Sequence, residues 1–406
     1  MASQVRARPG VVLGVGAGIA AYKACELLRL FTESGHEVRV VPTRDALRFV
    51  GEPTWAALSG NPVTSEVWES VHEVPHVRIG QGADLVVVAP ATADILAKAA
   101  HGLAGDLLTN TLLTARCPVV FAPAMHTEMW EHPATRANVA TLRERGSLVI
   151  DPAVGRLTGA DTGPGRLPDP QQIFEVCRRV LAGRERDLAG RRVVVSAGGT
   201  REAIDPVRFI GNRSSGLQGY ALARTAVARG AEVTLVAANV ALPDPAGVTM
   251  VRVESTLDLR AAVLAAAEGA DAVVMAAAVA DFRPAARSDS KIKKTSGEPE
   301  PIHLTKNPDI LAELCDRRRE GRKPAPEVIA GFAAETDDVL ANGRAKLARK
   351  GCDLLVVNQV GERLAFGTPD NAAVILVAGA ESVEVPRGPK EALADTVWDL
   401  VAARLA

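Results

Sequence analysis

The sequence predicts two α/β domains, each built around a doubly wound and mainly parallel β-sheet. The chain has 406 residues, which is enough for two domains of ordinary size. Short apolar runs alternate with stretches of helical spacing, and this pattern restarts near the middle of the chain. The segment ADLVVVAPATAD at 83–94 also returns in similar form as ADAVVMAAAVAD at 270–281. Strands that alternate with helices favour mainly parallel sheets.

The first half begins with a strand, a glycine turn and a helix. VVLGV at 11–15 has the pattern of a short buried strand, and GAGIAAYKACELLRLFTESG at 16–35 has a turn followed by helical spacing. Three further apolar runs are too short for helices and are predicted to be strands: HEVRVVPT at 36–43, DLVVVAP at 84–90 and PVVFAPA at 118–124. The charged segment VLAGRERDLAGRR at 180–192 follows, and we place the domain boundary there.

The second half repeats this order. RRVVVSAGGT at 191–200 reads as a strand and a glycine turn, SSGLQGYALARTAVARG at 214–230 as a helix, and AEVTLVAAN at 231–239 as a strand. ADAVVMAAAVAD at 270–281 and CDLLVVNQ at 352–359 follow as strands. The expected domains are therefore 1–183 and 190–406. A doubly wound fold, flavodoxin-like or Rossmann-like in the first and Rossmann-like in the second, is expected, and common ancestry of the two is left open.

Composition excludes several classes of protein. The formal net charge is −1, so the global balance does not favour a nucleic-acid or anionic-membrane partner. The five cysteines are scattered and contain no CxxC pair, which is typical of a reducing cytosol. The basic N-terminus lacks a cleavage-site pattern, and we expect no signal peptide and no membrane span.

Two familiar motifs are present only in part. The first turn has Gly14, Gly16 and Gly18, but Ile19 replaces the last glycine of the dinucleotide fingerprint, and no acidic residue ends the second strand. An NAD site is therefore disfavoured. HEVPH matches the zinc motif HExxH, but Pro75 lies between the two histidines and would interrupt the helix that this motif needs. His76 remains a candidate acid or base.

Several long motifs of the first half together resemble one enzyme family. In chain order they are GVGAGIAAYK at 14–23, PHVRIG at 75–80, APATADILAKAAHGLAGDLLTN at 89–110, APAMHTEMW at 122–130 and GADTGPGRLPDP at 159–170. These motifs resemble the FMN-dependent cysteine decarboxylases. In that family the flavin oxidises the substrate thiol to a thioaldehyde, so that the adjacent carboxylate leaves as it does from a β-keto acid.

The second half narrows the resemblance. Its motifs are GGTREAIDPVRFIGNRSSGLQGYALA at 198–223, AAAVADFRP at 276–284, KIKK at 291–294, KNPDI at 306–310 and GFAAET at 331–336. With them the chain resembles the bifunctional phosphopantothenoylcysteine decarboxylase/phosphopantothenate–cysteine ligases of coenzyme A synthesis. In bacterial members CTP activates phosphopantothenate as an acyl-cytidylate, and the amine of cysteine then attacks it.

The resemblance implies an FMN site in the first domain. His76 matches the family's active-site histidine, and a neutral imidazole suits handling of the thiol proton or orientation of the carboxylate. The residues expected to bind FMN are Gly14, Gly16, Gly18, Ile19, Thr43, Ala91, Thr92 and Ala93.

Two positions depart from the family's decarboxylase pattern. His126 stands where the family commonly has an asparagine that contacts the substrate carboxylate, and it is a candidate catalytic residue. Gly159 stands where the mobile flap usually has a proton-donating cysteine. Thr158, Asp161, His126 or water are the candidate replacements, and an inactive decarboxylase domain is the alternative.

The resemblance also assigns the ligase residues. Asn212 matches the asparagine that handles the acyl-nucleotide, and Lys291 matches a lysine flap that closes over the cytidylate. Asp281 is expected to hold the nucleotide or its magnesium. Lys346 and Lys350 are four apart on a predicted helix and share a face that suits a triphosphate. The remaining expected CTP-binding residues are Met275, Ala276, Ala277, Pro308, Asp309, Ile310, Leu311 and Phe332.

Partners are expected to be small molecules: 4′-phosphopantothenate, cysteine and CTP. The family is cytosolic and oligomeric, so the same is expected here. Two other classes of function stay open from the sequence. One is a flavoprotein that acts on cysteine-containing peptides, with the second domain as a binding module. The other is an NAD-dependent oxidoreductase.

Overall fold

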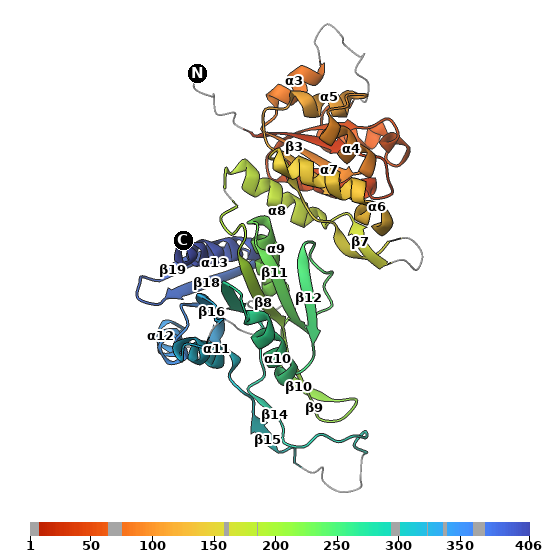
Figure 1. Cartoon of the computed structure of the whole chain (residues 1–406). Coiled ribbons are helices and arrows are strands. Elements are labelled where there is room, and N and C mark those ends of the chain that lie inside the picture. Colours follow the sequence, from red (N-terminus) through yellow and green to blue (C-terminus); the bar gives the residue numbers. More distant parts are fainter. Residues whose placement is uncertain are drawn as a thin grey trace. The chain divides into compact units, whose positions relative to one another are not determined.

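The computed structural model describes residues 8–63, 75–157, 162–184, 186–293, 301–322, 324–335, 339–359 and 370–406. The chain divides into two compact units. One contains Met1–Glu185 with the short segment Asp244–Gly247, and the other contains Arg186–Pro243 and Val248–Ala406. Figure 1 labels the helices and strands. No described helix is long and apolar enough to cross a membrane.

The first unit contains a five-stranded parallel sheet among its described residues. Its strands lie in the order β2-β1-β3-β4-β5, which is the flavodoxin-like order. They are β1 (Gly10–Val15), β2 (Glu37–Pro42), β3 (Leu85–Ala91), β4 (Val119–Pro123) and β5 (Leu148–Val149). β3 is buried along its whole length, as expected of a strand with helices on both sides.

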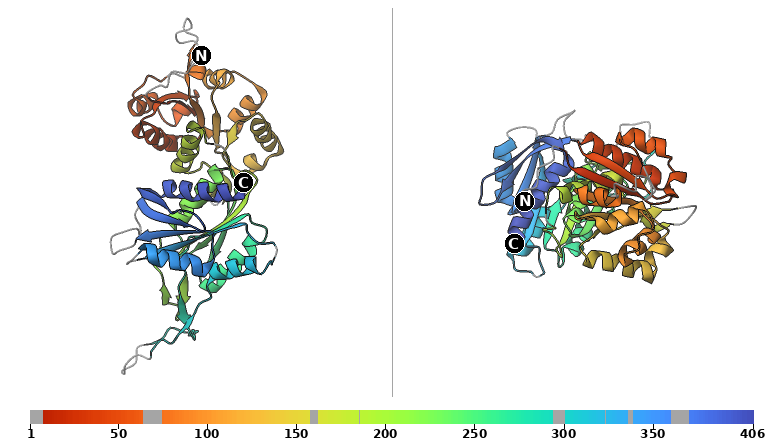
Figure 2. Two further views of the ribbon diagram at one scale, coloured as in Figure 1. Left: turned by 90° about the vertical axis from the view of Figure 1, so that its left-hand side faces the viewer. Right: turned by 90° about the horizontal axis from the view of Figure 1, so that it is seen from above.

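Helices cover both faces of this sheet (Figures 1 and 2). α1 (Ala21–Glu33) and α8 (Pro170–Leu181) pack together through Phe31 and Phe174, whose ring centroids are 5.2 Å apart. The apolar cluster on the opposite face joins α3 (Pro75–Gly82), α4 (Ala93–His101), α5 (Leu107–Thr114) and α7 (Pro133–Glu144) to the strands. The shorter elements are η1 (Ala46–Arg48), α2 (Glu52–Ser59) and α6 (Thr127–Glu131).

Local sequence explains where these helices begin. Thr92 caps α4 by accepting a hydrogen bond from the Ile95 amide, and Asp106 forms a capping box with Thr109 at the start of α5. Proline occupies the first position of α7 and of α8, where its missing N–H costs no hydrogen bond. An antiparallel hairpin of β6 (Ala153–Arg156) and β7 (Thr162–Arg166) precedes α8.

The second unit has a larger sheet, with eight strands among the described residues, in the order β12-β11-β8-β13-β16-β17-β18-β19. The first six are parallel in the Rossmann order, and the last two pair antiparallel. The strands are β8 (Arg192–Gly198), β11 (Glu232–Ala238), β12 (Val248–Val253), β13 (Ala272–Met275), β16 (Val328–Glu335), β17 (Leu354–Gln359), β18 (Asp370–Val377) and β19 (Val383–Pro389).

Helices also cover both faces of the second sheet. α9 (Leu217–Ala228) and α13 (Lys390–Leu405) share one apolar cluster, and the Trp398 indole donates to the Leu222 carbonyl at 2.9 Å. α10 (Thr256–Ala267) and α11 (Ile310–Arg319) lie on the other cluster, which Leu347 of α12 (Val339–Lys350) also joins. Two small hairpins extend from the unit (Figure 1): β9 (Arg201–Ala203) with β10 (Phe209–Gly211), and β14 (Phe282–Pro284) with β15 (Leu304–Lys306).

The expected fold class is confirmed: the chain has two doubly wound α/β units with mainly parallel sheets. One predicted strand is shorter than expected. β13 ends at Met275, and the remainder of its repeated segment leaves the sheet. The amides of Ala277, Ala278 and Ala280 bond instead to the strand end and turn at Ser196, Gly198 and Thr200. Because these amides bond to side-chain oxygens and a turn carbonyl, they do not continue the strand ladder, and the chain forms a loop.

Candidate functional sites

The first unit has a cavity of about 510 Å³ at the carboxyl ends of β1 and β3, where the strand order reverses. Ligands of open α/β sheets bind at such a switch point. Its lining comes from the turn after β1, the turn after β3, the start of α6 and the β6–β7 hairpin. The lining residues are Ala17, Gly18, Ile19, Ala20, Tyr22, Lys23, Pro90, Thr92, Ala93, Ala124, Met125, His126, Met129, Arg156, Leu157, Gly165, Arg166 and Leu167.

Two helix N-termini border this cavity. α1 begins at Ala21 and α4 begins at Ala93, so the first-turn amides and the positive ends of two helix dipoles lie beside it. Gly18 has open space where a side chain would stand. Lys23, Arg156 and Arg166 add positive charge to the lining, and Ile19, Met125, Leu157 and Leu167 add apolar surface. A phosphorylated molecule with a flat apolar ring, such as FMN, fits this combination of amides, cations and apolar walls.

The structure separates the predicted FMN residues into two groups. Gly18, Ile19, Thr92 and Ala93 line the cavity. Gly14 and Gly16 serve packing beneath it. A Cβ on Gly14 would lie 2.5 Å from Cδ1 of Leu108, and a Cβ on Gly16 would lie 2.5 Å from the Pro90 carbonyl oxygen.

The other two predicted FMN residues lie at strand ends. Ala91 is buried at the end of β3, while Thr43 follows β2, where its Oγ1 accepts from the Ala46 amide at 3.3 Å. Neither belongs to the cavity lining given above. Contact between these two residues and FMN stays a prediction.

The two predicted catalytic histidines lie in different places. His126 is exposed, precedes α6 and lines the cavity. His76 lies in the first turn of α3, and its carbonyl accepts from Oγ1 of Thr114 at 2.8 Å. Its Nδ1 atom is buried and has no hydrogen-bond partner among the described residues. His76 is not part of the cavity lining. His72 of the zinc motif lies outside the described residues, and α3 begins after it, at Pro75.

The flap positions are described only at their margins. Thr158, Gly159 and Asp161 lie outside the described residues. The flanking hairpin contributes Arg156, Leu157 and the stretch Gly165–Leu167 to the cavity. Arg156 and Arg166 are cavity cations that the motif comparison did not single out. Their signal in the sequence is position: Arg166 lies within the motif at 159–170, and Arg156 lies three residues before it.

The second unit has the corresponding switch point between β8 and β13. Its two turns bond directly to each other: Ala278 donates to the Gly198 carbonyl at 2.8 Å, and Ala280 donates to Oγ1 of Thr200 at 2.9 Å. A buried Glu202 accepts from the amide and the hydroxyl of Thr256 at 2.9 and 2.7 Å. These bonds fix the loop that carries Asp281. The residues of this buried network were not identified from the sequence.

Asn212 and Asp281 border this loop. The Asn212 side-chain amide donates to the Val279 carbonyl at 2.9 Å. Asp281 is exposed, and its carbonyl accepts from the Asn307 amide at 2.9 Å, which joins the loop to the predicted nucleotide segment Pro308–Leu311. The Asn307 side chain also donates to the Ala280 carbonyl and to Oγ1 of Thr256. The structure therefore brings the 276–281 and 308–311 segments together.

Two of the predicted lysines lie on one helix, and one of them lies near Asp281 and Asp309. α12 contains Lys346 and Lys350, and both are half-buried. Lys350 forms an ion pair with Asp309, the N-cap residue of α11. Burial lowers the pKa of the Lys350 ammonium, and the nearby Asp281 carboxylate partly opposes this effect. The described residues contain no group of three or more His, Cys, Asp or Glu side chains that could hold a metal.

The remaining predicted ligase residues lie on several elements. Met275 is buried at the end of β13, Ala276 and Ala277 follow it, and Phe332 is half-buried on β16, the strand next to β13. Lys291 is exposed in the segment after β14. A common role for Lys291 and the lysines of α12 stays a prediction.

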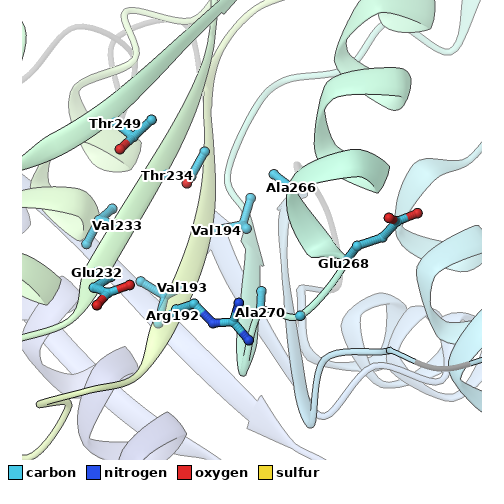
Figure 3. Close-up of a pocket in the computed structure, with 11 residues that line it drawn as sticks. Arg192, Val193, Val194, Glu232, Val233, Thr234, Thr249, Ala266, Glu268 and Ala270 are labelled. Carbon is cyan, nitrogen blue, oxygen red and sulfur yellow. The ribbon is translucent and has the colours of Figure 1, made fainter.

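The second unit also has a cavity of about 250 Å³ at the amino edge of its sheet (Figure 3). It lies between the starts of β8 and β11 and the end of α10, with Arg192, Glu232 and Glu268 as its charged residues. The backbone amide of Arg192 is bonded to Asp271 at 2.6 Å. None of the predicted site residues lines this cavity. It lies at the edge opposite to the switch-point turns.

Two family models match the chain, one in each half. Residues 2–182 match the family model described as Flavoprotein, and residues 188–405 match the DNA/pantothenate metabolism flavoprotein C-terminal domain. A solved structure of the C-terminal domain of Coenzyme A biosynthesis bifunctional protein CoaBC is 35% identical and covers 54% of this chain and 98% of its own, with a TM-score of 0.46.

Full-length relatives are similar along nearly the whole chain. Coenzyme A biosynthesis bifunctional protein CoaBC of Mycolicibacterium smegmatis is 58% identical over 98% of each chain. The protein of the same name from Mycobacterium tuberculosis strain H37Rv is 57% identical over 98% of this chain and 97% of its own, and that of Vibrio vulnificus strain YJ016 is 41% identical over 96% of each. Each family model matches one of the two α/β units, and the relatives match nearly the whole chain. The chain therefore belongs to the family of coenzyme A biosynthesis bifunctional proteins CoaBC.

Proposed function

We propose that the chain catalyses two consecutive reactions of coenzyme A biosynthesis. The second unit condenses 4′-phosphopantothenate with cysteine, using CTP and releasing CMP and pyrophosphate. The first unit decarboxylates the product to 4′-phosphopantetheine. The observation that carries this proposal is the end-to-end similarity to bifunctional relatives, which spans both units at 58% identity. The proposed domains are 1–183 for the decarboxylase and 190–406 for the ligase.

In the first unit, the cavity at the β1–β3 switch point is the proposed FMN site. The amides at the starts of α1 and α4, with Lys23, would hold the phosphate of FMN, and Ile19, Leu157 and Leu167 would supply apolar surface for its ring. When bound, FMN supplies the two-electron oxidant that the substrate thiol needs. His126 donates a hydrogen bond to the substrate carboxylate. The unpartnered Nδ1 of His76 supports a role in accepting or holding a proton, because a buried ring nitrogen without a partner is unusual.

In the second unit, the loop after β13 is the proposed nucleotide site. Ala276 and Ala277 let the nucleotide approach the backbone, and Asn212 holds the acyl-cytidylate. Lys346 and Lys350 neutralise the triphosphate, for which the pair between Lys350 and Asp309 opens. Magnesium is proposed to bind Asp281 and the phosphates of CTP. Magnesium sites often have one or two carboxylates with substrate phosphates and water, so a cluster of protein ligands is not needed.

A single incubation tests both reactions. The protein is mixed with 4′-phosphopantothenate, cysteine, CTP and magnesium, and the products are identified by mass spectrometry. We expect 4′-phosphopantetheine. Accumulation of phosphopantothenoylcysteine would contradict the decarboxylase and assign the loss to the flap position Gly159. Absence of both products would contradict the ligase.

Two further measurements test the two other classes of function left open by the sequence. A flavin absorbance spectrum of the purified protein argues against an NAD-dependent oxidoreductase. Pyrophosphate release that requires both CTP and phosphopantothenate argues against a mere binding module in the second unit. Cytosolic location and homo-oligomeric assembly are proposed from the family resemblance, and the mass of the purified protein in solution checks the assembly.

A further inference from the structure

The segment that carries Lys291 is bonded to the tip of the β9–β10 hairpin. The Ser288 amide donates to the Ile204 carbonyl at 3.0 Å. Ile292 is held at both of its peptide groups: its amide donates to Oδ2 of Asp205 at 3.1 Å, and its carbonyl accepts from the Arg208 guanidinium at 2.8 Å. The backbone on either side of Lys291 is therefore attached to a hairpin that lies far away in the sequence.

Asp205 is the centre of these contacts. Its side chain is fully buried. Oδ1 accepts from the amides of Val207 and Arg208, both at 2.8 Å, and Oδ2 accepts from the Arg208 guanidinium at 2.9 and 2.5 Å as well as from Ile292. The Arg208 guanidinium and these amides lower the pKa of Asp205, so it is ionised at neutral pH. A buried carboxylate with this many donors is a rigid attachment point.

We propose that Asp205 is a positioning residue for the ligase reaction, which fixes the backbone beside Lys291 so that the lysine closes over the acyl-cytidylate. This inference rests on the proposed function of the second unit. Asp205 itself contacts neither nucleotide nor reacting atoms; it acts through Lys291.

An exposed lysine loses conformational freedom when it closes over a bound molecule. Lys291 is exposed, and a long side chain on a free backbone would lose both backbone and rotamer entropy on closing. Anchoring Ser288 and Ile292 removes most of the backbone part of this cost before the substrate binds. Closure also protects the acyl-cytidylate from water, so poor positioning would release it to hydrolysis.

The variant Asp205→Asn tests this role, because it keeps the shape of the side chain and removes its charge. We expect the kcat of amide formation to fall by about tenfold, since the hydrogen bonds from Arg208 and Ile292 to Oδ2 are weakened. The KM for CTP should change little. The diagnostic readout is coupling: the variant should release more pyrophosphate than it forms amide, because the unprotected cytidylate hydrolyses.

A double-mutant cycle with Lys291→Gln distinguishes positioning from a general structural role. If Asp205 acts through Lys291, the variant with both changes is no slower than Lys291→Gln alone. If the rate losses of Asp205→Asn and Lys291→Gln instead multiply in the double variant, the inference is overturned.

Asp353→Asn is the matched control. Asp353 likewise accepts from an arginine, Arg318, at 2.6 Å and from a backbone amide, that of Ile329, at 2.7 Å, but it lies at the start of β17. Its effect should combine independently with Lys291→Gln, and coupling of pyrophosphate to amide should be unchanged.

A second variant keeps the test decisive if Asp205→Asn unfolds the second unit, which thermal unfolding would reveal. Ile292→Pro removes the amide that donates to Asp205 and restricts the backbone of Lys291, while the pair between Asp205 and Arg208 stays in place. We expect the same loss of coupling and the same non-additivity with Lys291→Gln. Full coupling in Ile292→Pro would overturn the inference. Failure of the unaltered enzyme to form amide would instead contradict the proposed function.

Discussion

The two candidate sites occupy the same place in similar sheets but are built differently. In the first unit, the switch point has a cavity of about 510 Å³ with apolar walls and a few cations. In the second unit, the corresponding turns are bonded to each other, and the charged residue Asp281 is exposed on the loop that they fix. The β6–β7 hairpin contributes to the wall of the first site, whereas the residues predicted for the second site lie on loops and on α12.

This difference corresponds to two kinds of ligand. A resident cofactor is retained through turnover, and a largely preformed apolar cavity favours that. A triphosphate enters and leaves in each cycle, and exposed charges attract it without holding its products tightly. Under the proposed function, the fold determines where each ligand binds, and the elements added around the strand ends determine whether it stays bound.

The change with the largest expected effect should destabilise the second unit and leave the first unit unaffected. Arg229 is 1% exposed and bonds to Asp187 and Asp399, with Asp395 at 3.7 Å. Arg229→Met removes the buried guanidinium and its bonds to these carboxylates, of which only Asp395 is buried, and this should lower the free energy of unfolding of the second unit by about 2–3 kcal/mol. Thermal unfolding should show the shift, and the flavin content of the protein should stay normal.

The control for this change is Arg319→Met, which removes an exposed pair with Asp316. Its effect on stability should be below about 1 kcal/mol. Loss of flavin together with ligase activity in Arg229→Met would contradict the independence of the two sites.

A second change should affect only the cavity. Gly165 has φ +151°, and a Cβ there would lie 2.2 Å from the Met125 carbonyl oxygen at the cavity wall. Gly165→Ala should weaken FMN binding by roughly thirtyfold, through steric overlap and backbone strain. Fluorescence titration of the protein with FMN measures this, and ligase activity should be unchanged.

Gly105→Ala is the matched control, because no atom lies within 4 Å of the added Cβ. It should bind FMN normally. Normal FMN binding by Gly165→Ala would mean that the β6–β7 hairpin does not form the wall of the cofactor site.

Raising the pH should have a smaller effect than these substitutions, and it should change the KM of the ligase for CTP. The pKa of Lys350 is lowered by burial, so its charge is lost at a lower pH than that of an ordinary lysine. As pH rises from 7 to about 10, the KM for CTP should therefore increase, by about fivefold if one phosphate contact is lost. Lys350→Arg keeps its charge and should give a flatter profile. An identical profile for both proteins would exclude Lys350 from the triphosphate site.

Ionic strength should produce the smallest effect. Exposed charges are screened by salt, so the KM for CTP should rise about two- to threefold between roughly 0.05 and 0.3 M salt. The FMN in the first unit should remain bound over this range, as absorbance after gel filtration would show. Release of FMN at the same salt concentrations would contradict the distinction between an enclosed and an exposed site.

The sequence by itself determined the fold class and the positions of the glycine turns. Strand and helix periodicity are local, so the pattern around β1 and α1, and again around β8 and α9, could be read directly. It also indicated the turn at Gly18 that lines the first cavity. The motif resemblance added the candidate residues, of which Ile19, Thr92 and His126 meet at this cavity.

Only the tertiary structure decided how distant segments meet. Arg156 and Arg166 reach a cavity that begins at the first glycine turn, and Asp205 holds Ile292. The repeated Ala-Asp segments also diverge: Asp94 pairs with Lys98 within α4 at 2.8 Å, whereas Asp281 lies in a loop fixed by Thr200 and Asn307. No periodicity records such contacts, because they depend on which strand ends the topology brings together.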